Sequence, residues 1–300
     1  MMDTDIGLIG LGVMGRSMAR NLLRGGFSLH VNTRTPEKAK ELISEGAVWH
    51  DRIGTIATKC QLVMTILGDP EDVKSIYMGE HGLLNLSQKD SILVDMTTSS
   101  PELAIKLNKL GQQNGIHVLD APVSGGDIGA RNASLSIMVG GNQEAFVKIL
   151  PILRTIGSNI VYQGPAGNGQ HTKMVNQICI AAGKLAVCEG LIYGQAVGLD
   201  LKNVLNSIES GAAGSWTLSN LGPRMLKGDF DPGFFIKHFV KDLRIAKKVA
   251  DVKELTMPGL KLALELYEAM IADGDGDLGT QALFKKMKSL SHTLDDPSLD

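Results

Sequence analysis

The sequence has few cysteines and no excess of charge of either sign. Its 300 residues include three cysteines, Cys60, Cys179 and Cys188, without the spacing of metal ligands. Three cysteines cannot all pair with one another, which favours a reducing, cytoplasmic compartment. Lysine and arginine total 30 against 32 aspartates and glutamates, a net charge of −2. This balance excludes the basic surface that nucleic acids and acidic membranes attract.

Segments that would direct the chain to a membrane are also lacking. The first residues, MMDTDIGLIGLGVMG, carry acids where a secretory signal has basic residues, and glycines interrupt them. No uninterrupted apolar run reaches the roughly 18 residues of a membrane span. The stretch DGDGDLG (273–279) has Leu278 and Phe284 where a calcium loop needs glycine and glutamate. We therefore expect a protein without membrane or nucleic-acid partners and without a metal site.

The first half of the chain alternates short apolar runs with amphipathic stretches. The runs are nearly continuous in apolar residues, which is typical of parallel strands covered on both faces. This alternation predicts an α/β domain with a doubly wound, mostly parallel sheet of Rossmann type. The predicted strands are IGLIG (6–10), LHVN (29–32), QLVMTIL (61–67), SILVDMT (91–97), IHVLDAP (116–122), LSIMVG (135–140) and NIVYQG (159–164).

Residues typical of helix ends lie between these strands. At 35–36, 69–70 and 100–101 an N-cap residue precedes a proline, which suits the first helical position. Glycines, which tolerate the left-handed conformation at a helix C-terminus, stand where three of the predicted helices would end. They are Gly25, Gly46 and Gly115.

The pattern changes after about residue 164. A long apolar helix is predicted from Gln170 to Val197, and its apolar positions cover nearly the whole circumference, so we expect it to be buried among other helices. Helical segments near 200–209, 215–227, 237–253 and 258–272 follow without a convincing strand. The sequence thus predicts two domains, a dinucleotide-binding domain over 1–164 and an all-helical substrate and dimerisation domain over 165–300, linked by the long helix.

The pattern G-x-G-x-x-G lies between the first predicted strand and the first predicted helix. Its first glycine makes a tight turn, its second lets the backbone approach a pyrophosphate, and its third lets the helix pack closely on the sheet. The phosphates would then meet the free N–H groups of the helix N-terminus. The alternative is a glycine-rich turn that serves packing only. The predicted cofactor-binding residues are Gly10, Leu11, Gly12, Val13, Met14 and Gly15.

The end of the second predicted strand bears on the choice of cofactor. NAD sites usually place an acid there to bind the ribose hydroxyls. This chain has Asn32 instead, followed by Arg34 and Thr35. A guanidinium can bind a 2′-phosphate that a carboxylate would repel, so the sequence favours NADP over NAD. The alternative for Arg34 is a solvated loop charge.

Two further strand ends are expected to face the cofactor, because ligands bind at the carboxyl ends of such strands. Leu67 lies in TILGDP (65–70), which would border the adenosine. Thr97 lies in DMTTSSP (95–101) and could reach the nicotinamide ribose. Helix capping is the alternative role for the threonines of this loop.

A turn of small residues ends the strand LDAPVSGG (119–126). Ser124, Gly125 and Gly126 offer a hydroxyl and backbone N–H groups that could bind a carboxylate. The turn could bind the carboxylate of a small substrate, but taken alone it could equally be a loop without a ligand.

The segment GPAGNGQHTKMVNQ (164–177) places Lys173 on the apolar entry to the long helix. Reduction of a carbonyl needs a proton donor near the oxygen on which charge develops. A partly desolvated lysine between two domains could supply it, and Asn176 and Gln177, one turn on, could hold the substrate or orient the lysine. The alternative is a lysine that extends from an apolar helix to solvent, with Asn176 packed or capping.

A last group of charges lies in FFIKHFVKDLRIAKK. Lys241 and Asp242 are flanked by apolar residues, so we expect one of the two to point inward. Lys241 could contact cofactor or substrate, and Asp242 could pair with it or hold a helix terminus.

Four of these motifs, in this order, resemble the β-hydroxyacid dehydrogenase family over essentially the whole chain. They are GLIGLGVMG, DAPVSGG, GPAGNGQHTKMVNQ and KDL. The resemblance implies an enzyme that transfers hydride between a nicotinamide cofactor and a small 3-hydroxy acid or its semialdehyde. It implies Lys173 as the catalytic lysine, Ser124 with Gly125 and Gly126 as the carboxylate-binding turn, and cofactor contacts from Thr97 and Lys241.

The resemblance also implies a homodimer or homotetramer joined through the long helix. Many family members have two asparagines where this chain has Asn176 and Gln177, which leaves open which of the two meets the substrate. Two other functions are possible on the same scaffold. One is imine reduction, but imine reductases usually lack the lysine. The other is a non-catalytic NADP(H)-binding sensor, against which the lysine and the substrate turn both argue.

Overall fold

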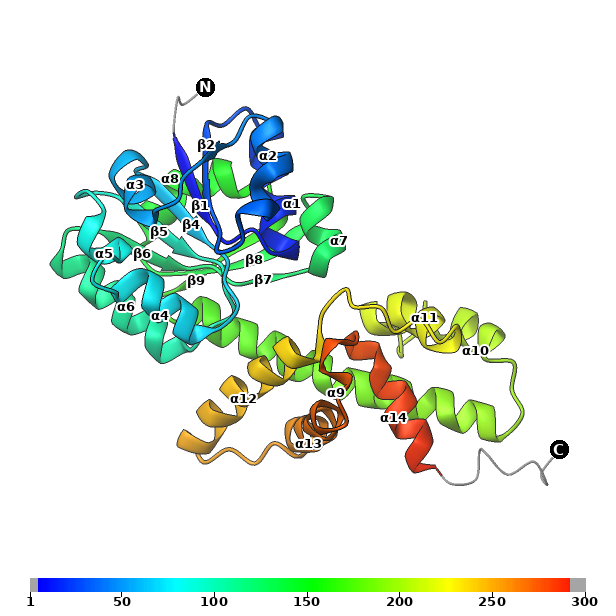
Figure 1. Ribbon diagram of the computed structural model, residues 1–300. Coiled ribbons are helices and arrows are strands. Elements are labelled where there is room, and N and C mark those ends of the chain that lie inside the picture. Colours follow the sequence, from blue (N-terminus) through cyan, green and yellow to red (C-terminus); the bar gives the residue numbers. More distant parts are fainter. Residues whose placement is uncertain (1–4, 292–300) are drawn as a thin grey trace. The chain divides into compact units, whose positions relative to one another are not determined.

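The computed structural model describes residues 5–291 and contains two compact units. The first comprises the chain through Lys173, and the second begins at Met174 (Figure 1). The division falls inside helix α9 (Asn168–Ala196), which belongs to both units. The sequence places the boundary near residue 165, at the turn before this helix.

The first unit is built on one sheet of nine strands within the described residues, in the order β3-β2-β1-β4-β5-β6-β8-β7, with β9 paired to β8. The pairs from β3 to β6 and the pair β8–β9 are parallel, whereas β8 runs antiparallel to β6 and β7. The mostly parallel sheet is therefore confirmed. Its strands are β1 (Ile6–Ile9), β2 (Leu29–Asn32), β3 (Val48–Trp49), β4 (Leu62–Thr65), β5 (Ile92–Asp95), β6 (His117–Asp120), β7 (Val123–Ser124), β8 (Leu135–Gly140) and β9 (Gly157–Gly164).

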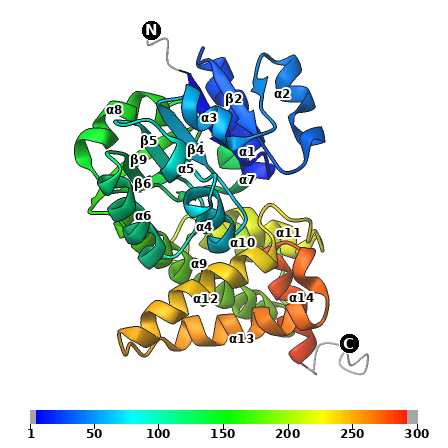
Figure 2. The same cartoon turned by 60° about the vertical axis from the view of Figure 1, so that its left-hand side comes forward.

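Helices cover both faces of the sheet, which explains the continuous apolar runs (Figures 1 and 2). Alternate strand residues enter different cores: Leu8 packs with α1, α2, α7 and α8, whereas its neighbour Ile9 packs with α3 to α6. These helices are α1 (Val13–Arg24), α2 (Lys40–Ser44), α3 (Ile53–Lys59), α4 (Pro70–Met78), α5 (Leu83–Leu86), α6 (Pro101–Gln113), α7 (Gly126–Arg131) and α8 (Gln143–Leu153), with a short 3-10 turn η1 (Pro36–Ala39) before α2.

Two of the three predicted helix starts are capped by a side chain. Asp69 accepts a hydrogen bond from the Asp72 backbone N–H at 2.9 Å, and Ser100 accepts one from Leu103 at 3.2 Å. Thr35 precedes η1 without a side-chain capping bond. Of the predicted C-terminal glycines, Gly46 and Gly115 have positive φ, whereas Gly26 takes that conformation in place of Gly25.

The second unit is helical, as predicted. Apolar residues of α9, from Met174 to Leu191, form its core together with residues of the helices that follow. Those helices are α10 (Leu201–Ile208), η2 (Thr217–Leu221), α11 (Gly222–Leu226), α12 (Ile236–Val252), α13 (Pro258–Ala272), η3 (Asp275–Asp277), η4 (Thr280–Ala282) and α14 (Leu283–Leu290). By length and composition α9 could cross a membrane, but a helix in the core of a folded domain meets the same criteria.

Candidate active site at the carboxyl edge of the sheet

The glycine loop between β1 and α1 has the geometry that a dinucleotide requires. Gly10 has a φ of 102°, and a side chain there would collide with the Ile66 carbonyl. A Cβ at Gly15 would collide with the Gly10 carbonyl, so this glycine lets α1 pack against the loop. A Cβ at Gly12 would meet nothing within 4 Å, and no side chain caps α1. An open backbone and an uncapped helix N-terminus are what a pyrophosphate needs, so these residues fit the cofactor.

Two of the predicted polar residues at the end of β2 and in the loop after it, Asn32 and Arg34, are bonded to neighbours in the same unit. Asn32 donates a hydrogen bond from Nδ2 to the His50 carbonyl at 2.8 Å. Arg34 lies largely in solvent, and its guanidinium binds both carboxylate oxygens of Asp72, at 2.9 and 3.2 Å. Thr35 is exposed. The sequence did not indicate Asp72 as a partner of Arg34, because 38 residues separate them.

The loops after β4 and β5 are joined by a hydrogen bond between two predicted residues. The Leu67 backbone N–H donates to Thr97 Oγ1 at 2.8 Å, and Thr97 is 2% exposed. The Thr97 hydroxyl thus fixes the loop that carries Leu67. A contact of either residue with the cofactor stays a prediction.

A buried carboxylate, Asp95, is the last residue of β5 and precedes Thr97 by two residues. It accepts hydrogen bonds from the Thr65 hydroxyl at 3.0 Å and the Thr97 backbone N–H at 3.1 Å, and Thr65 contacts Tyr77 Oη at 3.1 Å. Burial is the main cause that raises the pKa of Asp95 to about 6; the charge of Asp120 on the neighbouring strand acts in the same direction, and the hydrogen bonds from Thr97 and Thr65 act against it. This acid was not among the residues predicted for the site, although an acid at the end of an apolar strand can be recognised in the sequence.

The predicted substrate turn follows β6. Ser124 is half-buried in β7, whereas Gly125 is exposed. Gly125 and Gly126 have φ values of 128° and 63°, which L side chains rarely adopt. A Cβ at Gly126 would meet nothing within 4 Å, so the backbone there is open.

Lys173 is buried, with 6% of its surface exposed. It lies on the same face of α9 as Gln170, one turn earlier. The start of this helix is bound to the sheet: the carboxylate of Asp120 accepts hydrogen bonds from the backbone N–H groups of Gly167 at 2.8 Å and Gln170 at 2.9 Å. The helix that carries the predicted catalytic lysine therefore begins at the carboxyl end of β6.

The predicted polar residues of the second unit form a chain of contacts. Asn176 donates to Gln177 Oε1 at 2.7 Å, and Gln177 donates from Nε2 to Asp242 at 2.6 Å. Asp242 is 1% exposed and forms an ion pair with Lys241 at 3.1 Å. Asp242 is therefore the charge of the two that points inward, and of its two predicted roles the structure shows the pairing with Lys241.

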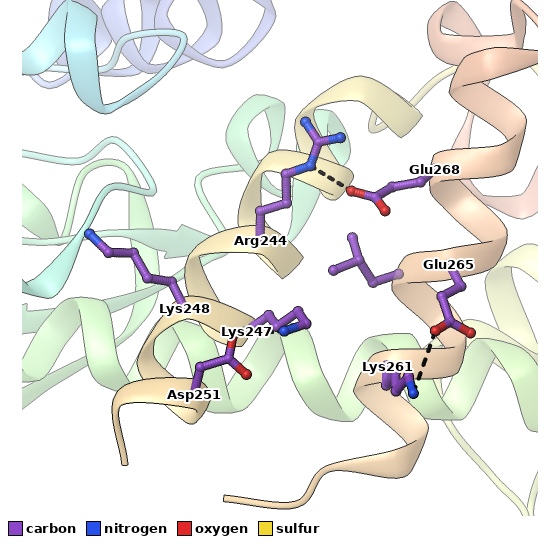
Figure 3. A pocket seen from close by; sticks show the side chains of 8 residues that line it. Arg244, Lys247, Lys248, Asp251, Lys261, Glu265 and Glu268 are labelled. Carbon is purple, nitrogen blue, oxygen red and sulfur yellow. Dashed lines mark hydrogen bonds and ion pairs between the residues drawn. The ribbon is translucent and has the colours of Figure 1, made fainter. Parts of the chain in front are cut away.

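The second unit also contains a charged groove of about 410 Å³ between α12 and α13 (Figure 3). Ion pairs line it, among them Arg244–Glu268 at 2.7 Å and Lys247–Asp251 at 2.6 Å. It is lined by none of the residues predicted for the site. Its charges are exposed and paired, which is typical of a solvated surface.

Two family models match successive parts of the chain. Residues 5–164 match the family model of the NAD binding domain of 6-phosphogluconate dehydrogenase. Residues 167–287 match the model described as NAD-binding of NADP-dependent 3-hydroxyisobutyrate dehydrogenase. An uncharacterized oxidoreductase of Bacillus subtilis (strain 168) is 50% identical over 95% of this chain and 99% of its own.

Relatives with more specific names are also similar over nearly full length. The probable 3-hydroxyisobutyrate dehydrogenase-like 1, mitochondrial, of Arabidopsis thaliana is 43% identical, over 97% of this chain and 87% of its own. The 2-hydroxy-3-oxopropionate reductase of Escherichia coli (strain K12) is 37% identical, over 96% and 98%. The structure of Psf3 in complex with NADP+ and 2-OPP, 28% identical, superposes with a TM-score of 0.88 and covers 94% of this chain and 99% of its own.

The fold, the glycine loop and these matches define an oxidoreductase that uses a nicotinamide dinucleotide. The chain belongs to the β-hydroxyacid dehydrogenase family, as its four motifs indicated.

Proposed function

We propose that this enzyme transfers hydride reversibly between NADP(H) and a small 3-hydroxy acid or its semialdehyde, with Lys173 as general acid and base. The observation that carries the proposal is that Lys173 is buried on a helix that begins at the carboxyl edge of the sheet. The glycine loop begins at the same edge, after β1. Parallel strands bring their carboxyl ends to one edge, which is where such sheets bind ligands.

Each residue group has one task in this reaction. The first turn of α1 and Gly12 would bind the pyrophosphate, and the bound nicotinamide supplies or accepts the hydride. Ser124 and the backbone of Gly125 and Gly126 would hold the substrate carboxylate. In reduction, the Lys173 ammonium would donate a proton to the carbonyl oxygen, and in oxidation the neutral amine would take the hydroxyl proton.

The hydrogen bonds of the two amides after Lys173 support different tasks for them. Gln177 is 1% exposed and uses both ends of its amide, one toward Asn176 and one toward Asp242. Asn176 is half-buried and is the residue of the two that we expect to contact substrate. Gln177 would then orient Asn176 and connect it to the Asp242–Lys241 pair.

The preference for NADP rests on Arg34. The Arg34 guanidinium pairs with the Asp72 carboxylate, but the side chain is 84% exposed, so a 2′-phosphate could reach the N–H groups that Asp72 does not bind. For Arg34→Ala we expect the Kd of NADPH to rise while that of NADH changes little, because the phosphate contact is lost and the carboxylate of Asp72, freed from its ion pair, would repel the 2′-phosphate that only NADPH carries. Titration of both reduced cofactors by fluorescence measures this, and an equal loss for both would refute the phosphate role.

The enzyme is proposed to act as a homo-oligomer. Helix α9 exposes an apolar stripe over 175–197, in which Val175 is 61% exposed and Tyr193 69% exposed. Large apolar side chains repeated along one helix face are typical of a protein interface. Sedimentation of the wild type and of Tyr193→Asp tests this, because the charge should weaken association.

The test of the central proposal is a kinetic panel of C3 and C4 semialdehydes with NADPH and NADH, on the wild type and on Lys173→Ala. Lys173→Ala should reduce kcat by about 10²–10⁴-fold, the usual contribution of a general acid, with cofactor affinity nearly intact. Substantial residual turnover would refute the role of the lysine. Tight NADPH binding without turnover of any substrate would indicate a sensor instead.

A further inference from the structure

The start of helix α9 is held by a side chain that is distant in sequence. Asn168, the first residue of the helix, donates its amide to the Gln163 carbonyl at 2.8 Å. The Asp120 carboxylate instead accepts the two backbone N–H groups, from Gly167 and Gln170. Negative charge and acceptor oxygens at this position stabilise a helix N-terminus. Asp120 therefore acts as the cap of a helix 47 residues further along the chain.

Two glycines allow this close approach. A Cβ at Gly140, the antiparallel partner of Asp120, would lie 2.7 Å from the Asp120 carboxylate. A Cβ at Gly169 would lie 2.6 Å from the Asp120 carbonyl oxygen and would collide with the Met138 carbonyl. The first turn of the helix thus lies directly on the ends of β6 and β8.

A second attachment comes from the helix itself. The Gln170 side chain is fully buried, accepts a hydrogen bond from the Ser99 backbone N–H at 2.9 Å, and donates one to the Thr97 carbonyl at 2.7 Å. Gln170 therefore binds the helix to the loop after β5, and Asp120 binds it to the end of β6. We name Asp120 and Gln170 the helix clamp.

We infer that the helix clamp is a positioning device for the reaction: Asp120 and Gln170 fix Lys173 relative to the substrate turn. Lys173 follows Gln170 by one turn on the same face, and the turn Ser124–Gly126 follows Asp120 by four residues. One carboxylate thus connects the strand that leads to the substrate turn with the helix that carries the lysine. This inference rests on the proposed acid–base role of Lys173.

A clamp that acts through Lys173 is distinguishable from a cap that only stabilises the fold. Asp120→Asn keeps the shape but offers one acceptor oxygen for two N–H groups. We expect kcat to fall on the order of 10- to 100-fold, because small misplacements of a catalytic group are that costly, while the NADPH Kd stays nearly unchanged. The matched control is Asn142→Ala, which removes the cap of α8, a 2.8 Å bond to the Ala145 backbone N–H. It should lower the free energy of unfolding without lowering kcat.

The decisive measurement is the double variant with Lys173→Ala. If Asp120 acts through Lys173, Asp120→Asn should lower kcat in the wild type but hardly lower the residual rate of Lys173→Ala. An equal factor in both backgrounds, or a folded Asp120→Asn with unchanged kcat, would overturn the inference. If Lys173→Ala alone keeps full activity, the proposed function fails instead. Should Asp120→Asn not fold, Gln170→Ala, which keeps the cap, provides the same comparison.

Discussion

The buried carboxylate of Asp95 makes stability depend on pH in a direction opposite to that of most acids. Its pKa is raised from the ordinary 3.8 to about 6. The folded state therefore disfavours the ionised form by about 3 kcal/mol, because a difference of one unit in pKa corresponds to roughly 1.4 kcal/mol. This penalty is absent below about pH 4, grows as pH rises toward 6, and is complete above it.

Asp95→Asn resembles the protonated acid and should remove this penalty. Its amide oxygen can still accept from the Thr65 hydroxyl and the Thr97 N–H. We expect the variant to be more stable than the wild type by at most about 3 kcal/mol at pH 7.5, with little difference at pH 4. Urea unfolding at both pH values and one protein concentration measures this, and Glu80→Gln, an exposed acid on the same unit, is the control. The opposite result would be that Asp95→Asn loses free energy of unfolding relative to wild type at pH 7.5 but not at pH 4. That result would show that the folded protein favours the ionised Asp95.

The remaining predictions concern the glycine loop and the thiols. Gly10→Ala should lower the free energy of unfolding by about 1–3 kcal/mol because it strains the backbone, whereas Gly12→Ala, in open space, should leave stability nearly unchanged and weaken NADPH binding. Thermal unfolding and cofactor titration of the two variants test this contrast, and equal stability losses would contradict it. Burial raises the pKa of the Cys60 and Cys188 thiols to about 12, so a thiol reagent should modify at most Cys179 before unfolding; modification of a second thiol in the native enzyme would contradict this.

The central strands of the sheet could be predicted because they bury both faces, as in β1, β4 and β5, and their sequences are therefore nearly continuous in apolar residues. The strands β3 and β7 were missed since each has two residues, and Val48 of β3 is 45% exposed. The last helix, α14, was also missed, although Leu283 and Phe284 join the core of the second unit. Short elements take their conformation from neighbours that the local sequence does not contain.

The sequence names candidate residues for the site but not the contacts that hold them in place. The loop from Gly10 to Gly15 could be predicted, because a positive φ and close backbone contacts require glycine at defined positions. The bonded partners are distant in sequence. Asp72 is 38 residues from Arg34, and Asp242 is 65 residues from Gln177. Asp120 is 47 residues from Gly167, which precedes α9. Their pairing depends on which strand ends and helices the fold brings together, which one sequence does not record.

The connection between β9 and α9 is short, so the orientation of Lys173 depends on the number of residues in this part of the chain as well as on their identity. Only residues 165–167 separate the end of β9 from the beginning of the helix. Deleting or inserting a single residue after the capped turn would rotate everything beyond it by about 100° about the helix axis. The Lys173 ammonium group would then lie on another face of α9. Natural variants should therefore differ between β9 and Lys173 by substitutions and not by insertions or deletions.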